Sequence, residues 1–323
     1  MHRPLISVIV PARDQAPFIA DSMTSLTRQF DDPSVMEILL VDDGSTDGTG
    51  ELAAAYAGRL PGLKILRNEQ PAGLAAARNR GLDAATGRYI AFLDPDDWYA
   101  PGHLARLTAE IHRLGVDFVR TDHIRHTDGV RTVHRAPQAR HGVALDPRAD
   151  IGPVHATTMV DYPYAPFGIF DGALRDAGLL HFPDGLQTAE DRPWIWRLHL
   201  KASSYAVVDA PGAFYRRGMP GSLSQVFDRR QLDFLRSYRE VFTLVGADPE
   251  AERFRPKAVR QFLAIACHHV DRSSRMDRGV RRQLRSGIRD TVAGLPAGAA
   301  RAGLADLDPK RRKVLTKVLR STL

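Results

Sequence analysis

The sequence has almost no cysteine and no long hydrophobic run. Among its 323 residues the only cysteine is Cys267, which excludes a disulfide framework and a cysteine-rich zinc site. No apolar segment approaches the roughly 18 residues that a membrane-spanning helix needs. The apolar run Leu5–Val10 is also too short for a secretory signal and lacks a small-residue cleavage pattern. These absences predict a cytoplasmic protein with an ordinary hydrophobic core.

Acidic residues are also scarce relative to basic ones. The chain has 38 Asp and Glu against 45 Lys and Arg, a formal net charge of +7. Such a balance favours anionic partners, which include nucleotides, phosphate polymers, acidic membrane surfaces and nucleic acid, without choosing among them. The hydrophobic fraction of 43% is typical of a folded globular chain. The length suits about two domains, since domains run roughly 100–200 residues.

The first half of the chain alternates apolar runs with segments of helical spacing. The runs are rich in β-branched residues and predict buried strands. The segments between them repeat apolar residues at helical intervals. This order predicts an α/β fold with a mostly parallel sheet and helices on both faces. The predicted strands are Leu5–Val10, Glu37–Val41, Leu63–Leu66, Tyr89–Leu93 and Val116–Val119, and the predicted helices are Phe18–Gln29, Thr46–Gly58, Leu74–Thr86 and Pro101–Leu114.

The second half is less regular and then becomes helical. Residues 120–170 are rich in His, Arg, Pro and Gly, and little can be predicted there. We expect residues 1–225 to form the first domain and residues 226–323 a mostly helical, basic C-terminal region. The stretch Gly294–Gly303, rich in Gly, Pro and Ala, is predicted to be a linker. The predicted helices of this half are Ala189–Lys201, Arg229–Val245, Pro256–Asp271, Arg278–Val292 and Pro309–Leu319.

Carboxylates cluster at the ends of two predicted strands. Asp42 and Asp43 follow one strand, and Asp94, Asp96 and Asp97 follow another. Ligands of an open parallel sheet bind at the carboxyl ends of its strands, so both clusters should face one pocket. A single Asp at such a place is equally explained as a helix cap or a turn residue. Three neighbouring carboxylates repel one another unless a cation offsets them, which predicts a Mg²⁺ or Mn²⁺ site that also takes a diphosphate.

Four segments, in this order, resemble the inverting family 2 glycosyltransferases. Each motif is weak alone, whereas the ordered set is specific, and the resemblance extends from residue 5 to about residue 225. It implies a GT-A fold, which is Rossmann-like and binds a nucleotide sugar. It also implies enzymes of the kind that build wall or capsule polysaccharide or glycosylate teichoic acid. The segments are Ser7–Pro11, Val41–Thr49, Ala77–Gly81 and Phe92–Asp97.

The resemblance implies roles for side chains on the donor side. Asp96 would hold the metal, and Asp97 would brace the turn. The other implied donor-binding residues are Pro11, Ala12, Arg13, Asp42 and Asn68 around the nucleobase, Arg78 near the base and phosphates, and Asp94 at the ribose or sugar.

The resemblance also implies a catalytic base. In this family the base is an Asp, often preceded by Glu, at the start of a helix that follows the sheet. Glu190 and Asp191 have that position. Asp191 would take the proton from the acceptor hydroxyl, and Glu190 would contact a sugar or acceptor hydroxyl. The local sequence alone has a simpler explanation, because acidic residues stabilise the first turn of any helix.

A basic segment, Tyr215–Ser224, resembles the family's segment that closes over the diphosphate. Arg216 or Arg217 would stabilise the leaving group through charge-assisted hydrogen bonds, and Ser222 would reach a phosphate. The sequence does not choose between the two arginines. A solvated basic loop is the alternative interpretation.

Two further basic groups lie near the C-terminus. They form the basic faces of two predicted helices and have three interpretations: solvated surface, docking to an anionic inner-membrane surface, or binding of a phosphate-rich polymer. Apolar residues beside the second group favour a weak membrane anchor or an oligomer contact. No nucleic-acid-binding motif accompanies the charge. The groups are Arg278, Arg281, Arg282, Arg285 and Arg289, and Lys310–Lys313 with Lys317 and Arg320.

The sequence therefore predicts a metal-dependent inverting glycosyltransferase. Its donor would be a UDP-sugar such as UDP-GlcNAc, UDP-Glc or UDP-Gal, and its acceptor a hydroxyl of a glycan or an anionic glycopolymer. Two alternatives stay open. One is a nucleotidyltransferase-like enzyme, which would release pyrophosphate. The other is a non-catalytic module that binds an anionic glycopolymer.

Overall fold

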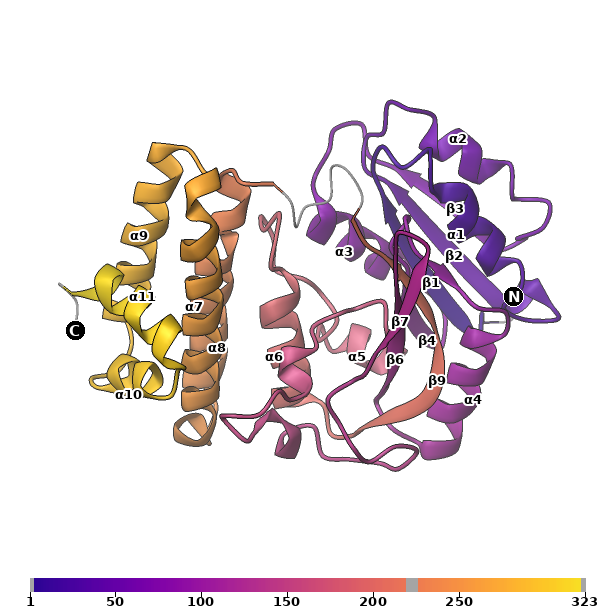
Figure 1. Cartoon of the computed structure of the whole chain (residues 1–323). Coiled ribbons are helices and arrows are strands. Elements are labelled where there is room, and N and C mark those ends of the chain that lie inside the picture. The colour runs from indigo at the N-terminus through magenta and orange to yellow at the C-terminus, as the bar shows by residue number, and fades with distance from the viewer. Residues whose placement is uncertain (1–2, 219–225, 321–323) are drawn as a thin grey trace.

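The computed structural model describes residues 3–218 and 226–320. A sheet with flanking helices forms one side of the molecule, and a group of C-terminal helices forms the other (Figure 1). Within the described residues there is one nine-stranded sheet, in the order β3-β2-β1-β4-β8-β6-β9-β5, and β7 pairs with β6. The strands are β1 (Ile6–Ala12), β2 (Met36–Asp42), β3 (Leu63–Arg67), β4 (Tyr89–Phe92), β5 (Trp98–Tyr99), β6 (Phe118–Thr127), β7 (Val130–His134), β8 (Gly168–Asp171) and β9 (Tyr205–Arg216).

The parallel part of the sheet confirms the alternation that the sequence predicts. β1 lies between β2 and β4, and all four strands β1–β4 run parallel. Every residue of β1, β2 and β4 is buried, as expected of strands covered on both faces. The helices between them are α1 (Ile19–Leu26), α2 (Thr49–Ala54), α3 (Leu74–Ala84) and α4 (His103–Leu114).

The fifth predicted strand does not lie beside the fourth, as it would in a simple parallel sheet. It is β6, which is longer than predicted and does not pair with β4. The short strand β8 lies between them and is antiparallel to both. Gly168 opens β8 where the carbonyl of Val119 leaves no room for a side chain: an added Cβ would lie 2.1 Å from its oxygen. The sheet is therefore mixed beyond β4, and the parallel order describes only its first half.

The C-terminal helices are α7 (Asp233–Gly246), α8 (Ala251–Arg272), α9 (Arg278–Ala293), α10 (Ala299–Ala305) and α11 (Pro309–Leu319). The prediction for Arg278–Val292 agrees with α9 to within one residue, and that for Pro309–Leu319 agrees with α11. The start predicted at Pro256 is wrong, because α8 begins at Ala251 and continues through the proline. Arg148 binds Asp248 and Glu250 at 2.8 and 2.6 Å and packs over Phe254, which holds this first turn in place.

The linker predicted over Gly294–Gly303 is too long. Residues 294–298 connect α9 to α10, whereas Ala299–Gly303 belong to α10, whose Ala300, Gly303 and Leu304 are buried. Gly303 packs against α8 so closely that a Cβ there would lie 2.7 Å from Val259. The small residues that indicated a linker therefore serve a close helix–helix contact.

The C-terminal helices share one core with the sheet. Helix α6 (Asp191–Lys201) packs against α7, and the Trp196 indole donates a hydrogen bond to Gln261 of α8 at 2.8 Å. Lys257 of α8 also forms an ion pair with Asp161 at 2.6 Å. The boundary predicted at residue 225 lies outside the described residues and stays a prediction.

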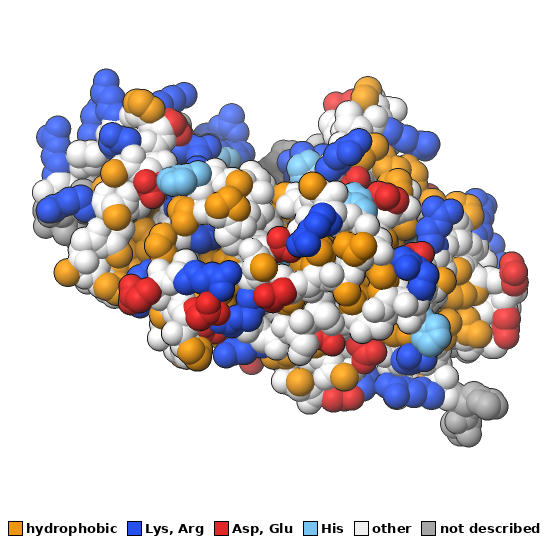
Figure 2. All heavy atoms as spheres, turned by 90° about the horizontal axis from the view of Figure 1, so that it is seen from below, with side chains coloured by type: hydrophobic (Ala, Val, Ile, Leu, Met, Phe, Trp, Pro, Cys, Tyr) orange, Lys and Arg blue, Asp and Glu red, His pale blue; other side chains and the backbone are white. Residues whose placement is uncertain are grey.

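The basic face predicted on α9 is at the surface. Val280, Leu284 and Ile288 are buried, whereas Arg282 and Arg285 are exposed. A view from below shows Lys and Arg side chains gathered over the C-terminal helices (Figure 2). None of the described helices is both long and apolar enough to cross a membrane.

Candidate active site

A cleft of about 1340 Å³ opens at the carboxyl ends of β1, β2 and β4. Two groups of residues line it. We call the first the sheet wall; it comprises Pro11–Gln15, Asp43, Pro71–Leu74, Ala77 and Asp94–Asp96. We call the second the arginine wall; it comprises Arg217, Phe227, Arg230, Arg272 and Arg275. The structure thus brings the predicted Pro11, Ala12, Arg13, Asp94, Asp96, Arg216 and Arg217 to one cleft.

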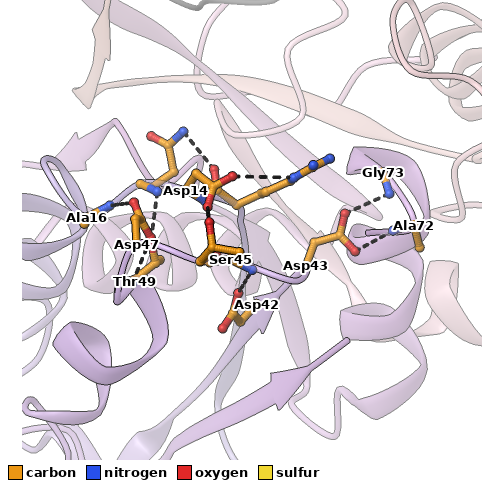
Figure 3. Close-up of polar contacts among 12 residues, drawn as sticks. Asp14, Ala16, Asp42, Asp43, Ser45, Asp47, Thr49, Ala72 and Gly73 are labelled. Carbon is orange, nitrogen blue, oxygen red and sulfur yellow. Dashed lines mark hydrogen bonds and ion pairs between the residues drawn. The ribbon is translucent and has the colours of Figure 1, made fainter. Parts of the chain in front are cut away.

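The two aspartates after β2 point in different directions (Figure 3). Asp43 lines the cleft and accepts backbone hydrogen bonds from Ala72 and Gly73, both at 2.8 Å. Asp42 is fully buried and forms an ion pair with Arg67. Asp42 is therefore not a lining residue, and the base contact implied for it stays a prediction. Asp43 occupies the place at the cleft that the sequence assigned to its neighbour.

Asn68 contacts Asp43, which lines the cleft. Its amide donates a hydrogen bond to Asp43 at 2.6 Å, and its oxygen accepts one from Arg80. Asn68 is not among the lining residues, so it orients the loop that leads into α3. Its predicted contact with a nucleobase is not tested.

The loops after β1 and β2 are tied together by short polar side chains (Figure 3). Asp14 accepts a hydrogen bond from the Thr46 backbone at 2.9 Å, and its own N–H donates to the Ser45 hydroxyl at 3.1 Å. Asp47 accepts one from the Ala16 backbone at 2.8 Å. Asp14 has a φ of 50°, a strained value for a residue with a side chain. These bonds fix Pro11–Arg13 at the edge of the cleft.

The acidic segment after β4 has one free carboxylate and two partnered ones. Asp94 forms an ion pair with Arg78 at 2.8 Å, and buried Asp97 accepts a hydrogen bond from the Arg216 backbone at 2.8 Å. Among the residues that the structure describes, the carboxylate of Asp96 forms no ion pair and accepts a hydrogen bond from its own backbone N–H. Burial and the nearby charge of Asp94 raise the pKa of Asp96 to about 6, and the charge of Arg216 opposes that shift.

This arrangement suits a divalent cation. Mg²⁺ binds through one or two carboxylates and completes its coordination with water and substrate phosphates. Asp94 and Asp96 supply that number of carboxylates. No cluster of three or more His, Cys, Asp or Glu side chains suited to a metal occurs among the described residues. A metal held here would therefore take its other ligands from a diphosphate and from water.

Arg78 links the donor side to the predicted base. Its guanidinium is 4% exposed and donates to Asp94 and to Glu190, each at 2.8 Å. Glu190 precedes α6, and Asp191 is its first residue. Arg78 is therefore a buried bridge and not a residue of the cleft surface, so its implied contact with base and phosphates stays a prediction.

Asp191 is held beside this bridge. Its side chain is 29% exposed, and the Arg192 guanidinium lies 3.9 Å away. Burial raises the pKa of Asp191, and the charges of Arg192 and Arg78 oppose that shift. Burial also raises the pKa of Glu190. Neither carboxyl lines the cleft itself; they are joined to it through Arg78 and Asp94.

The two arginines of the basic segment differ. Arg216 forms an ion pair with Asp21 at 2.7 Å and stacks over Phe18 and Trp98. The side chain of Arg217 is exposed and contacts the hydroxyl and ring of Tyr215, and its backbone N–H donates to the His126 carbonyl at 2.9 Å. The contact of either arginine with a diphosphate stays a prediction. Ser222 lies outside the described residues.

The lining residues that sequence reasoning missed include four from the C-terminal part of the chain: Phe227, Arg230, Arg272 and Arg275. They come from the segment before α7, from the end of α8 and from the short 3-10 turn that follows it. No motif surrounds them, and the region has many other arginines. The packing of α8 on α7, and of α7 on α6, brings them to the cleft.

Comparisons with known proteins agree with this geometry. The chain is 31% identical over 225 residues to the glycosyltransferase EpsJ of Bacillus subtilis, covering 69% of this chain and 64% of that protein. The solved structure of Staphylococcus aureus TarS 1–349 with UDP-GlcNAc superposes with a TM-score of 0.75 at 20% identity, covering 98% of this chain and 90% of that one. A mannosyltransferase of Pyrobaculum calidifontis with GDP-Man and Mn²⁺ gives a TM-score of 0.54 at 17% identity, covering 100% and 88%.

The fold and the cleft define a GT-A protein, as the TarS superposition shows. The profile of glycosyl transferase family 2 matches residues 7–181, more than half of the chain. The chain therefore belongs to glycosyl transferase family 2. It spans less than two thirds of EpsJ, so its activity and substrates are matters for proposal.

Proposed function

We propose that this chain is a metal-dependent inverting glycosyltransferase that moves a sugar from a UDP-sugar to a hydroxyl of a glycopolymer. One observation carries the proposal. Arg78 ties Asp94, at the carboxyl end of the parallel strands, to Glu190 and so to Asp191. The predicted donor site and the predicted base therefore lie in one connected site, as a single displacement requires.

The sheet wall supports a nucleotide donor. Backbone and side chains of Pro11–Arg13 and Asp43 offer polar groups at one edge of the cleft, and Asp94 and Asp96 lie at the other strand end. TarS, solved with UDP-GlcNAc, has the same fold, which makes UDP-GlcNAc the first donor to test. A diphosphate between Asp96 and Arg217 would meet a bound cation on one side and a guanidinium on the other.

In the proposed reaction Asp191 removes the proton from the acceptor hydroxyl. That oxygen attacks the anomeric carbon from the face opposite UDP. The bond from this carbon to the diphosphate oxygen breaks, so an α-linked donor gives a β-glycoside without a covalent enzyme intermediate. Arg217 donates hydrogen bonds to the departing diphosphate. Asp96, with Asp94 beside it, would hold a divalent cation, which would supply neutralising charge to the leaving group.

A UDP-release assay without acceptor tests this proposal. We expect slow Mn²⁺-dependent hydrolysis of one donor in a panel of UDP-, GDP- and dTDP-sugars, with the nucleoside diphosphate as product. Asp96→Ala should lower the rate by about a hundredfold, because a direct metal ligand is lost. Asp31→Ala removes an exposed carboxylate elsewhere and is the matched control. Release of pyrophosphate would instead identify a nucleotidyltransferase.

If no donor in the panel is hydrolysed, a second measurement is needed. Metal-dependent UDP binding by calorimetry, lost in Asp96→Ala and kept in Asp31→Ala, would show that the donor site is present and that turnover needs an acceptor. Absence of UDP binding would contradict the proposal. Cytoplasmic location, membrane-surface contact and oligomer formation stay predictions.

A further inference from the structure

The cleft contains more positive charge than its own acids neutralise. It is lined by six arginines and four aspartates: Arg13, Arg216, Arg217, Arg230, Arg272 and Arg275, with Asp14, Asp43, Asp94 and Asp96. Three of the arginines have carboxylate partners, in the pairs Arg13–Asp14, Arg216–Asp21 and Arg230–Asp228. Within residues 3–218 and 226–320, no ion pair is formed by Arg217, Arg272 or Arg275. The excess charge is therefore concentrated on the arginine wall.

Arg272 and Arg275 are held in place without being neutralised. Both guanidinium groups lie over the ring of Phe227, at 5.1 and 5.0 Å from its centre. Arg272 also donates to the Nε2 of His268 at 3.1 Å. Burial and the charge of Arg272 lower the pKa of His268, so this partner is neutral near pH 7. Two oriented cations with neutral neighbours are a ready site for an anion.

This pair is separate from the donor residues. Asp94 and Asp96 lie after β4, whereas Arg272 is the last residue of α8 and Arg275 lies in the 3-10 turn after it, both outside the family match of residues 7–181. The cleft volume of about 1340 Å³ also exceeds the roughly 300–1,000 Å³ of a site for one small ligand. The cleft has room for an acceptor beside the donor.

We propose that Arg272, Arg275 and Phe227 form an acceptor subsite that binds a phosphate of a phosphodiester-linked polyol or sugar polymer. The inference rests on the glycosyltransferase function proposed above and names the chemistry of its acceptor. The two guanidinium groups present several donors to the phosphate oxygens, with the fork geometry that suits phosphate. The ring of Phe227 offers an apolar surface to the carbon chain next to that phosphate. A hydroxyl of the same polymer would be directed toward Asp191.

The test is a binding experiment on the full chain with a short glycerol-phosphate oligomer. Arg272→Gln/Arg275→Gln should weaken oligomer binding by about tenfold to a hundredfold, because two charge-assisted contacts are lost. A neutral oligosaccharide of similar length should bind weakly to both forms. Arg272→Lys/Arg275→Lys should restore part of the affinity, since charge is kept while the fork is lost.

Two controls make the experiment specific. Arg282→Gln/Arg285→Gln removes the same charge from the exposed face of α9, outside the cleft, and should leave oligomer affinity within about twofold. Thermal unfolding should show that each variant is folded, since Arg275 is exposed and Arg272 half-buried. The KM for the donor in acceptor-free hydrolysis should be unchanged in the cleft variant.

Three results would overturn the inference. Unchanged oligomer binding in the cleft variant is the first. A raised donor KM would assign these arginines to the donor diphosphate instead. Loss of binding to phosphatidylglycerol vesicles, with oligomer binding intact, would assign them to a membrane surface. Because oligomer and vesicle binding need no turnover, the first and third outcomes are independent of whether the donor assay finds an activity.

Discussion

The two walls of the cleft hold their charged groups in opposite ways. On the sheet wall Asp43 accepts three hydrogen bonds from one loop, and Asp94 is paired with buried Arg78. On the arginine wall Arg272 and Arg275 rest on an aromatic ring and a neutral histidine. On the sheet wall Asp43 and Asp94 are held by partners, although Asp96 forms no ion pair among the described residues. On the arginine wall Arg272 and Arg275 keep their charge available for a ligand.

This difference between the walls coincides with the end of the segment that the family profile matches. The sheet wall lies within residues 7–181, which the family profile matches, and the whole arginine wall lies beyond them. We infer that the sheet wall and Arg217 serve the nucleotide sugar. The other residues of the arginine wall would serve the acceptor.

The largest expected effect is on the base. Asp191→Asn should lower transfer by about a hundredfold to ten-thousandfold, the usual contribution of a general base. Donor affinity and oligomer affinity should both be unchanged, because Asp191 belongs to neither wall. Steady-state transfer rates and UDP calorimetry measure the two effects, and Asp31→Asn is the control. Transfer at the wild-type rate would remove Asp191 from the mechanism.

The next largest effect is on stability and concerns Arg78, the buried residue that forms an ion pair with Asp94 of the sheet wall. Arg78→Met leaves Asp94 and Glu190 without their buried cation, which should lower the free energy of unfolding by about 3–5 kcal/mol. Arg272→Met on the other wall should cost less than about 1 kcal/mol, since no ion pair is broken. Urea unfolding of both variants gives the comparison directly. Equal costs would show that the two walls do not differ as described.

The sequence predicted the sheet wall well because its signals are local. Asp43, Asp94 and Asp96 directly follow strands, and the carboxyl ends of parallel strands share one edge. The sequence did not show which of Asp42 and Asp43 lines the cleft. Both are buried, but Asp42, the last residue of β2, accepts a hydrogen bond from the Ser45 backbone, whereas Asp43 lines the cleft.

Apart from Arg217, the arginine wall could not be predicted, because it depends on packing between distant segments. Arg272 reaches the cleft only because α8 packs on α7, and α7 on α6. The errors at Pro256 and Gly294–Gly303 have the same origin. Local composition indicated a helix start and a linker, whereas contacts with Arg148 and with Val259 decided the outcome.

The smallest effect compares the two ends of α8. In the segment before this helix, Arg148 forms an ion pair with Asp248 and lowers the pKa of its carboxyl to about 2. A lowered folded-state pKa gives stability that is present above the unfolded value and is lost as pH falls. Wild-type stability relative to Asp248→Asn should therefore be about 1–2 kcal/mol near pH 5.5 and shrink toward zero near pH 2.

Asp306→Asn, an exposed site after α10, is the control for this comparison and should show no such trend. At the other end of α8, Arg275→Gln should change stability little at any pH, because no carboxylate titrates against it. Urea unfolding at several pH values measures all three. A pH-dependent loss in Arg275→Gln would reveal a carboxylate partner for that arginine, and the contrast between a paired and an unpaired end of α8 would fail.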